Sequence, residues 1–308
     1  RAAATGAAGP SAPALAKPDA SQPAGDTAGA GTGAGLGSAA EDAARATAVV
    51  ARGRRGTSVS TAAAAALARS VKCSVKALAF DREGCREVQH ALETGGSKAA
   101  EQLARELVGC VGAAARCPSA NYVLQKCLAV LPPEAFQFVL DEILADSVED
   151  LACHRYGCRI LQRCLENGSD LQVDKLSAAL LPYVLSMGND AFGNYVVQQM
   201  LTSADPVWRS RTMSAIEASI AGLCYNPHGC AVMRAALVAG SPGERESLAR
   251  RIVAEPALLA SLACIRPGHL VVRRALDALS APEHREAIRG LLASAAVSRS
   301  RYGRALFH

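Results

Sequence analysis

The sequence repeats itself about every 36 residues, and this period constrains its fold more than any other feature. Seven similar segments align from residue 82 onward, and their third residues are separated by 36, 37, 36, 36, 39 and 35 positions. These third residues are small: Gly84, Ala120, Gly157, Gly193, Gly229, Gly268 and Gly303. A period of this length indicates an array built from one supersecondary unit. Because one unit cannot bury its own apolar face, neighbouring units must stack.

Within a unit, apolar residues recur at helical spacing. The run PEAFQFVLDEILADSV shows this with Phe136, Val139, Leu140 and Ile143. Each unit is therefore predicted to be a short helix, the small residue, a second helix, a turn and a third helix. We predict an all-α, curved solenoid of about seven three-helix repeats over residues 61–308. The sequence ends inside a repeat helix, so we expect this last repeat to be truncated and more repeats to follow in a longer protein.

Residues 1–60 have a different character, being rich in Ala, Gly, Pro and Ser without periodicity. Such a segment cannot bury enough apolar surface to offset its ordering entropy, so we predict a disordered tail. A small basic cluster, ARGRRGTSVS, occupies residues 51–60. It is interpreted as a solvated linker, with a weak RNA-contacting arm or part of a transit peptide as the alternatives.

Composition argues against several classes of protein. The 11 cysteines are odd in number and no secretory segment is visible, so a reduced intracellular compartment is favoured over a disulfide framework. No apolar run approaches the ~18 residues of a membrane-spanning helix. The net charge of +5 does not by itself indicate nucleic acid. Neither metal-ligand spacing nor a phosphate loop nor a nucleophile–base pair occurs, so we expect no cofactor, no metal and no enzymatic activity.

The fourth segment, GNYVVQQML, indicates what the repeats could bind. Asn194 and Gln198 are four residues apart and so share one face of a helix, with Tyr195 beside them. Two amides supply donors and acceptors to the edge of a nucleobase, and a Tyr ring or an Arg plane supplies a stacking surface. The same offsets recur in other repeats, which favours one base reader per repeat over a merely solvated helix face.

These segments resemble the repeats of the Pumilio (PUF) family of RNA-binding proteins, over about residues 66–308. In that family, the second helix of each repeat lines the concave face. Residues at i and i+4 hydrogen-bond one base, the residue after the first stacks on it, and one repeat reads one base. The resemblance implies the following RNA-binding residues, in chain order: Cys85, Arg86, Gln89, Asn121, Tyr122, Gln125, Cys158, Arg159, Gln162, Asn194, Tyr195, Gln198, Cys230, Arg234, His269 and Arg273.

The resemblance also implies which bases are read. Cys with Gln matches the adenine pattern, Asn with Gln the uracil pattern, and Cys230 with Arg234 a cytosine pattern. Family members bind RNA antiparallel, so the expected core is 5′-(C)UAUA-3′, with two unspecified bases upstream. Ala231 is no stacking residue, which should weaken binding at the fifth base. His269 and Arg273 are either a divergent reader or a phosphate-contacting or merely exposed pair.

The implied partner is single-stranded RNA in the 3′ untranslated regions of mRNA, bound by a monomer in the cytoplasm, with nucleolar or organellar locations left open. Repression or decay factors are further expected partners. Two alternatives remain at this point. A HEAT- or armadillo-like scaffold for proteins needs the same stacking without the amide register. A PUF-like ribosome-biogenesis factor would bind RNA through charge, without base readout.

Overall fold

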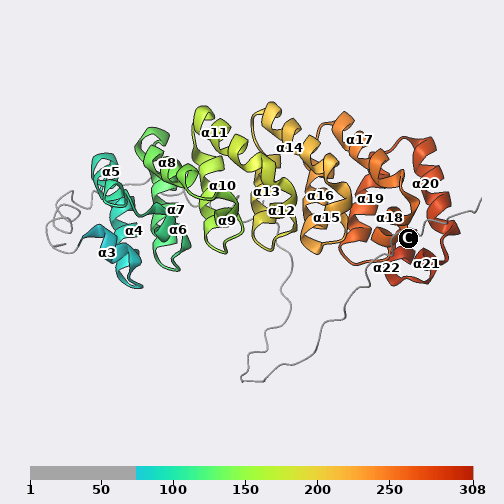
Figure 1. The fold of residues 1–308 in the computed structure, drawn as a ribbon, viewed down its shortest axis with the longest axis horizontal. Helices are drawn as coiled ribbons and strands as arrows, with labels where there is room; N and C mark the ends of the chain where they lie inside the picture. Colours follow the sequence, from blue (N-terminus) through green and yellow to red (C-terminus); the bar gives the residue numbers. More distant parts are fainter. Residues whose placement is uncertain (1–73, 308) are drawn as a thin grey trace, which may run out of the picture. The chain divides into compact units, whose positions relative to one another are not determined.

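The computed structural model describes residues 74–307, which are built from helices without any strand. The tail predicted for residues 1–60 and the seventh-repeat residue His308 lie outside this range. The helices form seven units that follow one another in a row, as Figure 1 shows. The all-α solenoid and its repeat length are thereby confirmed.

Three kinds of helix alternate along the described chain. The first helices are short: α3 (Val75–Phe80), α6 (Val111–Arg116), α9 (Val148–Ala152), α12 (Val184–Asn189), α15 (Ile220–Cys224), α18 (Pro256–Ala263) and α21 (Ala295–Arg299). The second helices are α4 (Gly84–Thr94), α7 (Ala120–Val130), α10 (Gly157–Asn167), α13 (Gly193–Leu201), α16 (Pro227–Ala239), α19 (Gly268–Ala278) and α22 (Arg301–Arg304). The third helices are α5 (Ser97–Arg105), α8 (Gln137–Ala145), α11 (Asp170–Leu180), α14 (Pro206–Ala218), α17 (Pro242–Val253) and α20 (Ala281–Ala293). Single 3₁₀ turns, η1 (Pro133–Phe136) and η2 (Leu181–Tyr183), precede α8 and follow α11.

The small residue of each repeat marks a close approach between the first and second helices. A Cβ atom at Gly157 would lie 2.4 Å from the carbonyl oxygen of Leu151, six residues earlier. At Gly193 the corresponding distance, to the oxygen of Met187, is 2.8 Å. Since real Cβ atoms do not approach other atoms this closely, glycine is what lets the second helix fold back against the first. The second unit has Ala120 here, fully buried.

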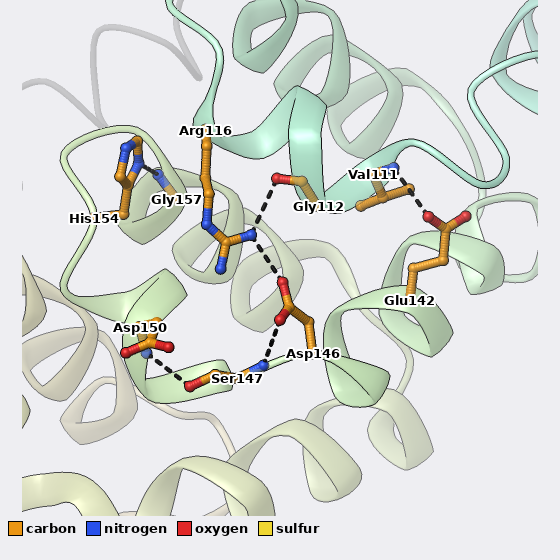
Figure 2. Close-up of polar contacts among 9 residues, drawn as sticks. All are labelled: Val111, Gly112, Arg116, Glu142, Asp146, Ser147, Asp150, His154 and Gly157. Atoms are coloured by element: carbon orange, nitrogen blue, oxygen red, sulfur yellow. Dashed lines mark hydrogen bonds and ion pairs between the residues drawn. The ribbon is translucent and has the colours of Figure 1, made fainter.

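A second recurrent feature caps the second helix from three residues before the small residue. Asp190 Oδ1 accepts hydrogen bonds from the N–H groups of Phe192 (2.8 Å) and Gly193 (2.7 Å). His154 Nδ1 accepts from Tyr156 and Gly157, both at 3.2 Å, and Figure 2 shows the second of these bonds. Different side chains therefore satisfy the same free N–H groups at a helix start. The residues at this position with such bonds are Asp81, Cys117, His154, Asp190, Asn226 and Ser300.

Hydrogen bonds also connect the third helix to the first in the second unit. The Glu142 carboxylate on α8 accepts from the N–H groups of Gly109 (2.6 Å) and Val111 (2.9 Å), at the start of α6. Figure 2 shows the bond to Val111, together with Arg116 bridging the Gly112 carbonyl and the Asp146 carboxylate. The bonds made by Glu142 and Asp146 connect α8 to α6 within the second unit.

The apolar core runs continuously from unit to unit. Second-helix residues four positions after the small residue are fully buried at Leu124, Leu161 and Val197. Cys127 and Cys164, seven positions after it, are buried to 0% and 3% exposure. Both cysteines thus belong to the continuous core.

Candidate nucleic-acid interface

The second helices pack against one another in succession, from α4 through α7, α10, α13 and α16 to α19. Figure 1 shows them side by side along the middle of the array. Side chains at one offset from the small residue therefore recur at one place on each successive unit. We call the side chains one, two and five positions after the small residue, in the first six units, the reading row.

The second position of the reading row is exposed where a stacking residue was predicted. Tyr122 and Tyr195 are 52% and 43% exposed, which is unusual for large aromatic rings, and Arg86 and Arg159 are exposed as well. The Arg159 guanidinium lies over the Tyr195 ring, 5.5 Å from its centroid. Stacking groups of two successive units thus lie next to each other.

The last position carries half-buried glutamines whose amides are held from one side. Gln125 Nε2 donates to Asn121 Oδ1 at 3.0 Å, and Gln198 Nε2 donates to Asn194 Oδ1 at 2.9 Å. In the first unit Gln89 Nε2 donates instead to the backbone oxygen of Cys85, at 3.0 Å. Each amide is therefore oriented by the first position of its own helix.

The first position differs from the expectation that its side chains project toward bases. Asn121 and Asn194 are only 1% and 3% exposed. The Asn194 Nδ2 group donates to the carbonyl oxygens of Asp190 (2.9 Å) and Ala191 (3.0 Å). Because this position directly follows the close approach at the small residue, its side chain lies in the turn between the first and second helices. Of the two amides in each pair, that of the glutamine is the more exposed to solvent.

The cysteines at the first position are buried in the same way. Cys85 and Cys158 are 5% and 1% exposed, and each Sγ lies near the carbonyl oxygen of the residue three before it, at 3.3 and 3.7 Å. Burial raises the pKa of the Cys158 thiol, against the lowering effect of Arg159. The thiol therefore stays protonated at neutral pH and acts as a small donor to the backbone.

One glutamine of the reading row has an unmet donor. Gln162 Nε2 is buried and has no hydrogen-bond partner among the described residues, while its Oε1 accepts from Arg159 at 3.4 Å. An unpaired buried N–H group costs about 1–3 kcal/mol and needs an explanation. A ligand that accepts a hydrogen bond at the third unit would provide one.

The fifth and sixth units carry the reading row differently. Cys230 is 1% exposed, with its Sγ 3.3 Å from the Cys224 carbonyl oxygen, and burial raises its pKa to about 11. Arg234 is half-buried beside it. Ala231 and Leu270 occupy the stacking positions, so these two units offer neither an aromatic ring nor a guanidinium plane there.

The two predicted readers of the sixth unit are engaged with the seventh. His269 stacks on the Tyr302 ring with centroids 5.2 Å apart, and Arg273 Nη2 donates to the Ala305 carbonyl oxygen at 2.8 Å. Both residues thus take part in packing between units in this structure. Their assignment as base readers stays a prediction, as it does for the other residues of the reading row.

Two other kinds of site are not found in the part of the chain that the structure describes. Residues 74–307 contain no cluster of His, Cys, Asp or Glu suited to a metal ion. Within the same range, every helix is too short or too polar to cross a bilayer.

Known proteins resemble this chain in the same repeats. A sequence profile for the Pumilio-family RNA binding repeat matches residues 74–108, 115–144, 147–181 and 183–207. Pumilio homology domain family member 4 of Saccharomyces cerevisiae is 52% identical over 82 residues, covering 27% of this chain and 9% of that protein. Pumilio homolog 9 of Arabidopsis thaliana is 36% identical over 121 residues, covering 38% of this chain and 21% of that protein. The matches thus span only 9% and 21% of these two relatives.

Solved structures resemble the whole array. The Puf4 RNA binding domain bound to an HO endonuclease RNA 3′ UTR recognition sequence is 26% identical with a TM-score of 0.71, covering 81% of this chain and 80% of that one. PUF-8 in complex with PBE-RNA has a TM-score of 0.73 at 20% identity, covering 79% of this chain and 73% of that one, a likeness of fold alone. Repeat profile, relatives and fold agree: the chain carries Pumilio-family RNA binding repeats within residues 74–207, and the array shares the fold of solved Pumilio-family domains.

Proposed function

We propose that this chain binds single-stranded RNA, with one base read by each of the first five units and a core of 5′-(C)UAUA-3′. The observation that carries the proposal is the Arg159–Tyr195 pair, in which exposed stacking groups of successive units lie 5.5 Å apart beside half-buried glutamines. In the second helices of the first four units, this position is occupied in turn by an exposed Arg or an exposed Tyr. No packing role requires such residues to be exposed there.

The stacking residues at the second position of the reading row supply affinity for RNA. A base between two stacking groups needs roughly 7 Å, since stacked bases lie about 3.4 Å apart. The Arg159–Tyr195 pair must therefore open slightly to admit a base. Stacking contributes about 1–3 kcal/mol per base, so the four stacking residues can support a specific complex. Ala231 lowers this contribution at the fifth base.

The glutamines supply selectivity. An amide carries both an acceptor oxygen and a donor NH₂, so it can match either uracil or adenine, depending on how it is turned. In the second and fourth units an Asn holds the Gln Nε2, and in the first unit a backbone carbonyl holds it. In these three units the Gln Nε2 is held within the helix, so its Oε1 is the atom left to accept from a base, and the two classes differ in what holds the Nε2.

The biological role belongs to the same proposal. Solved family members are described as bound to 3′ UTR recognition sequences, which supports mRNA 3′ untranslated regions as the target of this chain as well. We propose that it acts there in the cytoplasm as a monomer that brings repression or decay factors to the message.

Selection of bound sequences from a random RNA pool tests the core most directly. The expected result is a selected element in which U and A alternate over four positions, preceded by C. An enriched element without this alternation would contradict the assignment of the first four units. A protein-binding scaffold would enrich no sequence at all.

A matched pair of variants tests the register on a single helix. Gln198→Ala should weaken binding of the core RNA about tenfold, and replacing the uracil it reads should then have little further effect. Gln199→Ala is the control, because Gln199 is also half-buried on α13 but lies outside the reading row. Fluorescence anisotropy at several salt concentrations measures both. Equal losses in the two variants, or binding that depends on salt but not on sequence, would favour charge-driven binding instead.

A further inference from the structure

A cavity of about 220 Å³ lies between the fifth and sixth units. It exceeds the about 30 Å³ that one water occupies in the liquid, so it can admit a polyatomic group. Its walls come from three helices, α16, α17 and α19. The lining residues are Leu237, Pro242, Arg245, Arg274, Asp277 and Ala278.

Two guanidinium groups line the cavity without being neutralised, that of the half-buried Arg245 and that of the exposed Arg274. Among the described residues, neither Arg245 nor Arg274 has a carboxylate within 4.0 Å, and neither side chain makes a hydrogen bond. The Arg245 Nε atom is buried without any partner. A guanidinium stays charged in proteins, so a buried and unpaired Nε–H is costly unless a ligand accepts from it.

Other units neutralise the cation at the equivalent position. Arg163 lies six residues after Gly157 and is paired with Glu166 at 2.6 Å. Arg274 lies six residues after Gly268, with Asp277 at the same three-residue spacing, yet these two groups are more than 4.0 Å apart. The sixth unit therefore keeps its guanidinium available where the third does not.

The cavity borders the surface on which RNA is proposed to lie. Arg274 directly follows the reading-row residue Arg273, and Asp277 lies four residues after Arg273, on the same face of α19. Pro242, at the first position of α17, lies at the cavity wall, and this helix start is already capped by Ser241 and the Glu244 carboxylate. The two guanidiniums of the lining outweigh the single lining carboxylate of Asp277, so the site favours an anion.

We infer that this cavity binds a backbone phosphodiester of the RNA, on the 5′ side of the base read by the fifth unit. The inference rests on the proposed function and its antiparallel polarity. Arg side chains suit phosphate oxygens because their planar forks donate two parallel hydrogen bonds. The fifth and sixth units have Ala231 and Leu270 where the earlier units stack, so charge replaces stacking as the means of holding the strand there.

Two RNAs separate this inference from the proposed function: the core CUAUA, and the same core with three more nucleotides at its 5′ end. The unmodified protein should bind the longer RNA about tenfold more tightly. Arg245→Gln and Arg274→Gln should each remove most of this gain while keeping the affinity for the core. Arg285→Gln, an exposed arginine of α20, is the control that should keep the gain. Replacing the upstream phosphate by a neutral methylphosphonate should act like the Arg variants, and the salt slope should fall by about 0.7 per lost phosphate contact.

The outcomes distinguish the two ideas. If the core binds but the extension adds nothing, or if the gain survives in both variants, the phosphate site is overturned and the base readers stand. If the core itself does not bind, the proposed function fails. In that event the Arg245 Nε–H resonance, followed by NMR during titration with inorganic phosphate, decides the cavity alone. A shift that is lost in Arg274→Gln supports an anion site, and no shift overturns it. Thermal melts confirm that each variant is folded.

Discussion

At the scale of single residues, the three positions of the reading row differ in depth. In the first four units, the first is buried, the second is exposed and the last lies between them. Substituting Asn194 would leave Gln198 Nε2 without its acceptor and the carbonyl oxygens of Asp190 and Ala191 without their donor. Changes at the first position therefore alter stability as well as recognition. Changes at the stacking and glutamine positions report on binding more cleanly.

A prediction at this scale concerns the cap made by His154. Burial, followed by the positive charges of Arg116 and Arg155, lowers the pKa of His154. Only a neutral ring can accept through Nδ1, so the cap should be complete above the unfolded pKa of about 6.5. It should be lost as the pH falls from there through the lower folded pKa, because the unfolded chain then binds more protons. Stability should drop by up to about 1 kcal/mol, the usual contribution of a cap.

Urea unfolding between pH 7.5 and 5 measures this effect. His154→Asp should retain the cap, as Asp81 and Asp190 do in their units, and should flatten the pH dependence. His154→Ala should lose the cap at every pH. A slope that is unchanged in His154→Asp would show that another group is responsible.

At the scale of the helical element, the close approach at the small residue decides how each unit folds back on itself. Gly157→Ala should destabilise the protein by about 1–3 kcal/mol, because the added Cβ would lie 2.4 Å from the backbone oxygen of Leu151 and the helices must separate. Thermal or urea unfolding measures the change.

A second glycine in a helix provides the control. Gly290 lies inside α20 with nothing within 4 Å of its Cβ position, so Gly290→Ala should stabilise by about 0.5–1 kcal/mol through helix propensity. Opposite signs for the two substitutions would establish that the effect at Gly157 is steric. A stabilising Gly157→Ala would mean that the turn relaxes easily.

At the scale of the whole molecule, each unit packs on its neighbours and the core is continuous, so unfolding can be followed through thiols distributed along the array. Burial raises the pKa of Cys127 and Cys164 to about 12, so the reactive thiolate is scarce in the native state. Iodoacetamide at pH 8 should label the half-buried Cys117 and Cys264 first.

Mass spectrometry of labelled peptides tests this order. Cys127 and Cys164 should react only as their units open, and denaturant should bring them to the rate of Cys117. Native labelling of Cys127 as fast as Cys117 would mean that the second unit is open in solution. Reducing agent should leave the fold unchanged, since all ten described cysteines are free thiols.

Much of this protein could be predicted from its sequence, because repeat period, helix boundaries and side-chain offsets are local properties. The spacing from Gly84 to Gly303 sets the units, and helix geometry places Tyr195 and Gln198 at fixed offsets from Gly193. Burial depth is not local, since it depends on how closely the first helix approaches the second. Only the tertiary structure revealed that Asn121 and Asn194 lie inside the turn.

Contacts between units also could not be predicted from the sequence pattern. His269 meets Tyr302 across 33 positions, and Arg245 shares a cavity with Arg274 from another helix. No motif links such residues, because the stacking of whole units brings them together. The sequence by itself determined which side chains recur on each unit. The tertiary structure decided which of them are exposed, which are occupied by a neighbouring unit, and where two charges from different units meet, because these depend on the packing between units rather than on the periodicity within one.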